Sequence, residues 1–560
     1  MPDGAGGFRW PNHSPRLAPA DCGPGAKFPQ TTCATAASGY LAPVTSGSSS
    51  TINRRMGIAA VIVAGGVLLS RVLGVLRDIV FAGMLGATGV TDEYVAAFTI
   101  PDFMNYLLAG GFLAITFIPI FSRYLADDDE EGGWEALTAV IRPLAVGIVL
   151  LVIIGWALAP TVINALFPDF TAEQAAATVR LTRIVLPAQV FFVLGALFTA
   201  VQYAKGQFFI PTLAPIIYNL GIIGGGILYA LFTGEPDPEG FIWGAVIGAF
   251  IGNFALQWWG ARRLGMHLIW RLPWRNPVIL EYVKIAFPLM IGQSVVVLDE
   301  TFMRMFGNMS GEGVQTQLQY ARRTMLVPVG VIAQAAGVAA YPFLARQFAE
   351  GKLVQMANTV DRALRWVLAL SLAAAALLVA LSIPTVRVLF ERFEFNPADT
   401  EATASALFFY AFAIPVWGAL MVITRAFYAR RQMWTPVIVG TAAALLAVPL
   451  YFALQREFAI EGVALASTLA LGAYTLTLAI LWYREPNHSH RWRRVLDPAA
   501  RAVPLAVFGG GAAYLVAAGI QSALPTGFFS ALLAVLLGTA TFAAVALGLG
   551  SLLSRRFAPT

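Results

Sequence analysis

The first candidates for chemistry are three charged residues inside a long apolar stretch. Arg71, Arg77 and Asp78 interrupt the apolar residues near 57–85. A charged side chain within a membrane span costs about 2.5–3.5 kcal/mol on insertion scales, so it normally faces a cavity or a partner. On a helix, Arg71 and Asp78 lie on nearly one stripe two turns apart, and Arg77 lies about 120° away. The pattern indicates either a structural Arg71–Asp78 pair with an interfacial Arg77, or a cationic site.

A second group of charges begins the eighth apolar stretch of the chain. Arg322 and Arg323 are adjacent there, and adjacent residues do not share one face of a helix. One of the two is expected to pair with Asp299 or Glu300, for which Arg304 competes. The candidates are more cationic than anionic, and the planar fork of arginine matches phosphate oxygens. The charges therefore favour a site for an anion such as a phosphate group.

Other residue types give little support for enzyme chemistry. The sequence has no nucleotide-binding loop of the Gly-x-x-x-x-Gly-Lys-Ser/Thr type. The glycine run 224–226 is expected to permit close packing of helices rather than to bind phosphate. The histidines and cysteines all lie outside the apolar stretches, at His13, His267, His488, His490, Cys22 and Cys33. We therefore expect no enzyme activity, no metal site and no cofactor.

The elements that position these charges are stretches long enough to cross a membrane. The 560-residue chain is 58% hydrophobic and only 12% charged, whereas a soluble domain carries about 25% charged residues. About 20 apolar residues cross the hydrocarbon core as a helix. The sequence thus predicts an all-α polytopic membrane protein. Its fourteen expected transmembrane helices lie near 57–85, 94–121, 136–159, 180–204, 211–233, 241–260, 279–302, 313–345, 360–383, 404–428, 434–454, 458–482, 500–520 and 527–553.

The charged loops set the expected orientation. The net charge is +6, and the lysines and arginines of the loops fall in alternate loops or at the termini, as the positive-inside rule requires. The acidic run at 126–131 disagrees, but acidic residues count little in this rule. Both termini are therefore expected to be cytoplasmic. Because topology accounts for the basic residues, we expect no nucleic-acid partner.

The sequence also contains an internal repeat. The surroundings of Pro119, Pro160 and Pro211 recur 223, 224 and 225 residues later. Six expected helices separate the paired elements, and an even number preserves the chain direction. The two halves are therefore parallel repeats about an axis along the membrane normal, an arrangement common in transporters that rock about a central cavity.

This repeat divides the chain into expected parts. We expect a six-helix N-lobe at 56–260, a cytoplasmic linker at 261–278 and a six-helix C-lobe at 279–482. Residues 483–560 would form two further C-terminal helices and a tail. Residues 1–55, rich in Pro, Gly, Ser and Thr, are either a disordered tail or sequence upstream of the true start.

Several charged residues lie in motifs whose order is informative. The first stretch and the loop after it carry Ser70-Arg71-Val72-Leu73-Gly74, then Arg77-Asp78, Thr91-Asp92 and Pro101. The eighth stretch carries Tyr320-Ala321-Arg322-Arg323 with Pro328-Val329-Gly330-Val331. These motifs resemble the MurJ (MviN) family of lipid II flippases, within the multidrug/oligosaccharidyl-lipid/polysaccharide exporter superfamily. The resemblance covers roughly residues 57–556.

The resemblance implies both a fold and an activity. It implies a fourteen-helix, multi-pass protein of the bacterial inner membrane that contacts membrane lipids. Such a protein would flip lipid II, the undecaprenyl-diphosphate-linked disaccharide pentapeptide, from the cytoplasmic to the periplasmic leaflet by alternating access. By analogy, Arg71, Arg77 and Arg323 would engage the diphosphate in a central cavity. Asp92 would lie at the outer gate, and the two extra helices would help to form a groove for the lipid tail.

Some positions depart from the family pattern. Where many members have an arginine in the second span, this chain has Asn105, which we keep as a substrate-binding candidate. Asp78 and Asp299 are kept as gate or structural candidates. Asp299 matches one ligand of the sodium site described in some members, but the eleventh stretch has no Asp or Asn. The sequence therefore gives little support for sodium coupling.

Three other functions fit parts of the pattern. A flippase for another polyprenyl-diphosphate-linked glycan would use the same arginines and differ only in its sugar contacts. A cation-coupled drug exporter would need acidic cavity residues, so the basic bias argues against it. A non-transporting cell-wall scaffold would keep partner binding without flipping.

Overall fold

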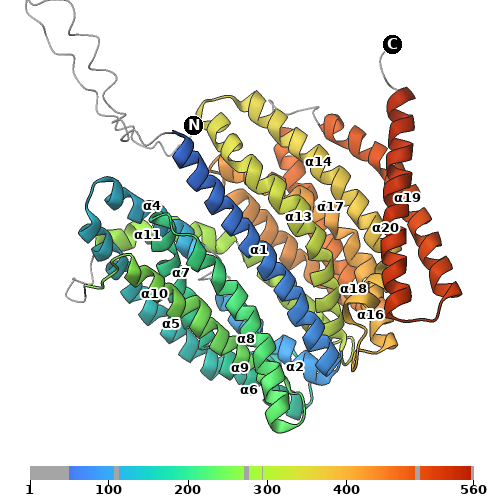
Figure 1. Cartoon of the computed structure of the whole chain (residues 1–560), viewed down its shortest axis with the longest axis horizontal. Coiled ribbons are helices and arrows are strands. Elements are labelled where there is room, and N and C mark those ends of the chain that lie inside the picture. Colours follow the sequence, from blue (N-terminus) through green and yellow to red (C-terminus); the bar gives the residue numbers. More distant parts are fainter. Residues whose placement is uncertain (1–48, 106–111, 270–275, 293, 486–491, 557–560) are drawn as a thin grey trace, which may run out of the picture. The chain divides into compact units, whose positions relative to one another are not determined.

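The helices of the chain follow the expected apolar stretches. The computed structural model describes residues 49–105, 112–269, 276–292, 294–485 and 492–556 (Figure 1). These residues form helices joined by short connections, with no strand among them, so the expected all-α fold is confirmed. Residues 1–48, which form most of the expected N-terminal tail and include both cysteines, lie outside the described residues.

The expected N-lobe contains the first helices of the described chain. Their bounds are α1 Ser49–Leu85, α2 Gly89–Ala97, α3 Thr99–Met104, α4 Phe112–Ala126, α5 Glu130–Leu166, α6 Ala172–Val185, α7 Ala188–Ala204, α8 Phe209–Thr233, α9 Pro238–Gly248, the π-helix η2 Ala249–Ala255 and α10 Leu256–Arg263. Local signals fix several ends. Thr171 caps α6 by accepting a hydrogen bond from the Gln174 backbone N–H, and Asp237 caps α9 ahead of Pro238.

The remaining helices belong to the expected C-lobe and C-terminal segment. Their bounds are α11 Pro277–Gly292, α12 Ser294–Asn308, α13 Val314–Ala349, α14 Leu353–Ala380, α15 Ser382–Phe390, α16 Pro397–Ala411, α17 Ala413–Ala429, α18 Trp434–Arg484, α19 Trp492–Ala523 and α20 Phe528–Arg556. α18 covers both the eleventh and the twelfth expected spans. Ala459 inside it has φ 46° and ψ −119°, which marks the boundary between those spans.

Many of these helices can cross a membrane. Eight helices of the described chain are long and apolar enough, or nine if α16 and α17, bent by 43°, form one span. Helix also dominates the described residues of the other expected spans. Large apolar side chains cover outward surfaces: Phe232 is 87% exposed, Leu446 78% and Leu515 70%. Apolar surface of this extent indicates contact with lipid.

α8 and α9 pack backbone against backbone. A Cβ atom on Gly225 would lie 2.5 Å from both the Gly240 carbonyl oxygen and the Gly244 Cα, and one on Gly226 would overlap the Phe241 ring. The expectation that this glycine run permits close helix packing is confirmed for these two residues. Gly224 has nothing within 4 Å of its Cβ position and plays no such part.

α11 packs against helices of the expected N-lobe. Val278, Tyr282 and Ala286 are buried in an apolar cluster with residues of α4, α5 and α7. Arg123 of α4 also forms an ion pair with Glu281 at 2.9 Å. α12, in contrast, packs against α18. α11 and α12 thus have different neighbours, whereas the expected lobe boundary at 279 stays a prediction.

Candidate functional site

An ion-pair cluster joins α1 of the N-lobe to α13 of the C-lobe. Asp78 Oδ1 accepts hydrogen bonds from Arg77 Nε at 3.1 Å and Arg77 Nη2 at 3.0 Å. The same oxygen forms an ion pair with Arg323 Nη1. Arg77 Nη1 donates to Asn219 Oδ1 of α8 at 3.2 Å. α1 therefore lies between α8 and α13, as Figure 1 also shows.

The adjacent arginines of α13 point to different partners, as their spacing predicts. Arg322 pairs with Asp299 of α12, inside the C-lobe. Asp299 Oδ1 also accepts hydrogen bonds from Tyr451 and Ser467, each at 2.9 Å. Its two oxygens are therefore held by donors from α13 and α18, which supports a structural role for Asp299. Arg323 is left to reach across to Asp78.

Arg71 also reaches α13, and it does not pair with Asp78. A Cβ atom on Gly330 would overlap the Arg71 guanidinium, so this group lies against the α13 backbone. Gly330 follows Arg323 by two helical turns, about 10 Å along the axis. The Arg71–Asp78 pair, one of the two alternatives that the sequence left open, is not among the ion pairs of the described residues, because Asp78 turns toward Arg77 and Arg323. Arg71 nevertheless contacts α13, the same helix that carries Arg323.

The cluster is closed in this structure. The pocket among Arg77, Asp78, Tyr94 and Arg323 measures about 10 Å³, which is room for about one water molecule. The Arg323 side chain is 38% exposed and that of Asp78 only 10%. Any group larger than a water molecule would therefore need α1 and α13 to move apart before it could reach the arginines.

The N-termini of α2 and α13 hold each other through exchanged carboxylates. Asp92 accepts hydrogen bonds from the backbone N–H groups of Gly313 at 2.7 Å and Thr316 at 2.9 Å, and from the Thr316 hydroxyl at 2.8 Å. In return, Glu312 Oε1 accepts from the Gly89 N–H at 3.0 Å. A helix N-terminus attracts anions through its free N–H groups and dipole. Each lobe thus caps a helix of the other.

This exchange follows the internal repeat. Gly89 and Gly313 are 224 residues apart, and so are Asp92 and Thr316, the same offset as in the sequence repeat. Another hydrogen bond joins the two lobes at the same end, where the Asp169 N–H donates to Asn308 Oδ1 at 3.3 Å. The lobes are therefore closed against each other at the end where Asp92 lies.

Burial changes the acid–base behaviour of Asp92, which precedes the second expected span. Desolvation raises the pKa of its carboxyl to about 7, although hydrogen bonds from Thr316 and Gly313 oppose this shift. Glu312 of the C-lobe adds repulsion of like charge. The proton affinity of Asp92 thus depends on the contact between the lobes.

A second ion pair between the lobes escaped sequence reasoning. Arg304 of α12 contacts Asp102 of α3 at 2.6 Å and lies 3.9 Å from Glu300. Sequence reasoning considered Arg304 only as a rival partner for Asp299 or Glu300. Asn219 and Glu312 were also missed. The available signal for Asn219 was an asparagine inside an apolar stretch, whereas no signal in the sequence pointed to the contact of Glu312.

Asn105 is not part of the cluster in this structure. It ends α3, and its backbone N–H donates to the carbonyl oxygens of Pro101 and Asp102. Among the described residues, its side chain forms no hydrogen bond to Arg77 or Arg323. The neighbouring residues 106–111 lie outside the described chain. Its role in binding substrate stays a prediction.

Comparison with known proteins decides the family. The sequence model described as lipid II flippase MurJ matches residues 81–535. The chain belongs to the MurJ family of lipid II flippases. A probable lipid II flippase MurJ from Rhizobium tropici is 28% identical over 459 residues, which cover 81% of this chain and 86% of that protein. The lipid II flippase MurJ of Burkholderia cenocepacia is 26% identical over 385 residues, 68% of this chain and 74% of its own.

Solved structures of transporters share the fold of this MurJ-family chain. A lipid II flippase MurJ in an inward closed conformation has a TM-score of 0.72 at 22% identity and covers 89% of this chain and 99% of its own. An inward-facing multidrug resistance transporter of the MATE family has a TM-score of 0.60 at 16% identity, covering 74% of this chain and 94% of its own. At such identities the likeness concerns the fold.

The MurJ family match covers only part of the site. Asp92, Asp299 and Arg323 lie within the matched residues, whereas Arg71 and Arg77 precede residue 81. For these two arginines, the motif and the geometry of α1 carry the argument.

Proposed function

We propose that this MurJ-family protein flips lipid II from the cytoplasmic to the periplasmic leaflet of the bacterial inner membrane by alternating access. One observation carries the proposal: Asp78 bonds to Arg77 and Arg323 and so joins the two lobes through a group of arginines. Basic groups between two lobes that can separate suit an anion that must cross the bilayer. The diphosphate of an undecaprenyl-linked precursor is such an anion.

In this proposal Asp78 occupies the place of the substrate anion in the described state. Its carboxylate neutralises Arg77 and Arg323 while the pocket is closed. When the lobes separate, the diphosphate would replace Asp78 as the partner of Arg323. Each charge-assisted hydrogen bond contributes about 1.5–3 kcal/mol, and a diphosphate offers more acceptor oxygens than one carboxylate. Arg71, nearer the start of α1, would meet the diphosphate first.

The contacts around Asp92 support a state that is closed toward the periplasm. Asp92 and Glu312 cap helices of the opposite lobes at that end, so the substrate would enter from the opposite, cytoplasmic side. Both chain termini are cytoplasmic in this proposal, as the distribution of lysine and arginine predicts. Rocking of the lobes would then break the caps and open the outer end.

The lipid tail would remain in the bilayer during the crossing. A groove of about 690 Å³ is lined by α14, α15, α16, α17 and α19, and small residues such as Ala376 and Gly510 contribute to it. Its lining is mostly apolar, which suits a polyprenyl chain. We propose this groove as the path of the tail while the head group passes between the lobes.

Replacing Arg71 tests the proposal in cells. We expect Arg71→Ala to insert normally but to fail to support growth of cells depleted of their own lipid II flippase, because the diphosphate loses a charged partner. Arg262→Ala is the matched control, since Arg262 lies at the end of α10 over the Trp258 ring. The measurements are growth and the amount of protein in the membrane.

The outcome also separates the alternatives. Full growth with Arg71→Ala would contradict the proposed site. If the chain did not restore growth but restored a missing surface polysaccharide, a flippase for another polyprenyl-diphosphate-linked glycan would replace the proposal.

A further inference from the structure

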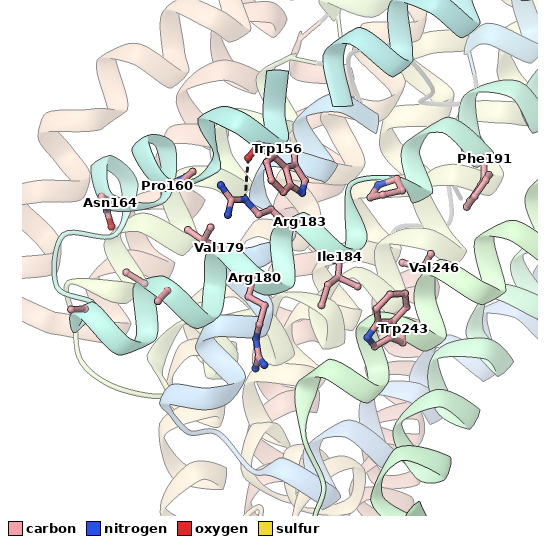
Figure 2. Close-up of a pocket in the computed structure, with 14 residues that line it drawn as sticks. Trp156, Pro160, Asn164, Val179, Arg180, Arg183, Ile184, Phe191, Trp243 and Val246 are labelled. Atoms are coloured by element: carbon pink, nitrogen blue, oxygen red, sulfur yellow. Dashed lines mark hydrogen bonds between the residues drawn. The ribbon is translucent and has the colours of Figure 1, made fainter. Parts of the chain in front are cut away.

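A separate groove lies on the outer surface of the N-lobe. It is formed by α5, α6, α7 and α9 and has a volume of about 850 Å³, within the about 300–1,000 Å³ typical of small-molecule sites. Figure 2 shows Trp156 and Pro160 along one wall and Trp243 and Val246 at the other end. None of the residues of the Asp78 cluster lines it.

Arg183 is held in this groove in a defined orientation. Its Nε donates a hydrogen bond to the Trp156 carbonyl oxygen at 3.2 Å, drawn as the dashed line in Figure 2. Its guanidinium carbon lies 4.1 Å from the centroid of the Trp156 ring, close enough for a cation–π interaction. The contact with Trp156 fixes the plane of the guanidinium, and the two terminal nitrogens are left to bind a ligand.

The charge of the groove is not balanced. The ion pairs of the described residues do not include Arg183. Arg180, the other arginine of the groove, pairs with Glu239 at 3.0 Å, and Glu239 also accepts a hydrogen bond from Trp243 Nε1 at 3.2 Å. Glu93 also interacts electrostatically with Arg180, so the acidic groups near the groove face Arg180 and leave Arg183 without an acidic partner among the described residues. An arginine within a membrane span normally meets an anion or an aqueous cavity.

The depth of Arg183 indicates what kind of anion can reach it. α5 has 37 residues, about 55 Å of helix, which exceeds the hydrocarbon core of about 30 Å by roughly 25 Å. Arg183 lies about 17 Å from the start of α6, so it falls close to the boundary between hydrocarbon and head groups. Trp156 and Trp243 are 48% and 46% exposed, and tryptophan is typical of this boundary. Lipid phosphates lie at the same level.

We propose that this groove binds an anionic phospholipid, with its phosphate at Arg183 and an acyl chain along the apolar wall. Phe191, Ile184 and Val246 provide apolar surface beyond the arginine. The lipid belongs to the leaflet next to the α5–α6 loop, which the loop charges predict to be periplasmic. The site is independent of the Asp78 cluster and takes a bulk membrane lipid rather than the transported precursor.

Native mass spectrometry of the full-length protein in detergent tests the proposal. The probes are phosphatidylglycerol, phosphatidylethanolamine and inorganic phosphate, each titrated separately. We expect phosphatidylglycerol to bind the unmodified protein more tightly than phosphatidylethanolamine. We expect Arg183→Gln to weaken phosphatidylglycerol binding at least about tenfold, the effect of losing one charge-assisted hydrogen bond. A photoactivatable phosphatidylglycerol should cross-link to peptides of α5, α6, α7 or α9.

Matched variants keep the test decisive. Arg263→Gln removes another arginine stacked on a tryptophan, 3.7 Å from the Trp259 ring and outside the groove, and should leave the affinity unchanged. If Arg183→Gln fails to fold, Arg183→Lys takes its place in the test. This variant keeps the charge and should retain most of the binding. Equal affinities for the two phospholipids, full binding by Arg183→Gln, or cross-links confined to other helices would overturn the proposal. Competition by inorganic phosphate at the same affinity would reduce the groove to a site for small anions.

Discussion

Asp78 is the residue on which the closed state of the site depends. Its one carboxylate faces Arg77 from its own helix and Arg323 from the other lobe. Helical spacing offered Arg71 as one possible partner of Asp78 but could not decide, because spacing on one helix carries no information about the neighbouring helix. The adjacent pair Arg322 and Arg323 was different: two residues on separate faces must have separate partners, and the sequence therefore predicted their divergence.

Removing the Asp78 charge should destabilise the protein. Asp78→Asn leaves Arg77 and Arg323 close together without a carboxylate, and we expect a loss of about 2 kcal/mol, less than the about 3–5 kcal/mol for fully buried pairs because Arg323 is partly exposed. The measurement is thermal unfolding of the purified protein in detergent. Asp127→Asn, in an exposed loop, is the control.

A double variant identifies the source of this loss. If repulsion between the arginines is responsible, Asp78→Asn combined with Arg323→Gln should recover part of the stability. Equal unfolding temperatures for Asp78→Asn and the unmodified protein would show that the cluster contributes nothing to the closed state.

Helices were the part of the fold that the sequence predicted best. Apolar stretches of about 20 residues leave few alternatives in a membrane, since only a helix or a closed barrel satisfies the backbone there. The turn at Phe98, which separates α2 from α3 within the second expected span, was not predicted. α11 and α12 pack against different helices, and hydropathy gives no signal of that difference.

The glycines between α8 and α9 offer a test at the level of helix packing. Gly225→Ala should cost about 1–3 kcal/mol, because the new Cβ would meet backbone atoms of Gly240 and Gly244 and force the helices apart. Gly224→Ala, one residue earlier, has open space around its Cβ position and should be neutral or slightly stabilising. Thermal unfolding of the two variants measures the difference, and equal stabilities would contradict backbone-to-backbone packing.

For the whole molecule, the repeat is the feature that connects sequence to mechanism. The offset of 224 residues, visible in the sequence, is also the spacing of Gly89 to Gly313 and of Asp92 to Thr316. The repeat predicted two parallel lobes but not their contacts, because those depend on which conformational state the lobes adopt. Asp92 was placed at the outer gate by family resemblance; its cap on α13 is a finding of the structure.

The closure of the outer end should depend on pH. In an open state Asp92 would be solvated, with a pKa near the usual value of about 3.9, whereas burial against α13 raises its pKa to about 7. At a pH between these two pKa values, closing of the lobes is accompanied by the uptake of a proton by Asp92. The closed state is therefore favoured as the pH falls, and it loses this contribution as the pH rises through 7. Glu312, which faces Asp92 across the contact, adds to the repulsion at high pH.

Fluorescence energy transfer between the lobes measures this dependence. Labels at Thr171→Cys and Glu401→Cys, with the two native cysteines replaced by serine, should report less closure at pH 8 than at pH 5. Asp92→Asn should flatten the profile. Glu93→Gln should not: burial also raises the pKa of Glu93 to about 7, but the charges that act on it lie in its own lobe. A profile that Asp92→Asn leaves unchanged would contradict the linkage.

The most direct test of the account is the leaflet in which lipid II resides. In cells depleted of their own flippase, lipid II should accumulate in the cytoplasmic leaflet, and expression of this chain should restore its appearance in the periplasmic leaflet. Arg323→Gln, present in the membrane at the same level, should not restore it. Restoration by Arg323→Gln equal to that by the unmodified chain, or no restoration by the unmodified chain, would contradict the account.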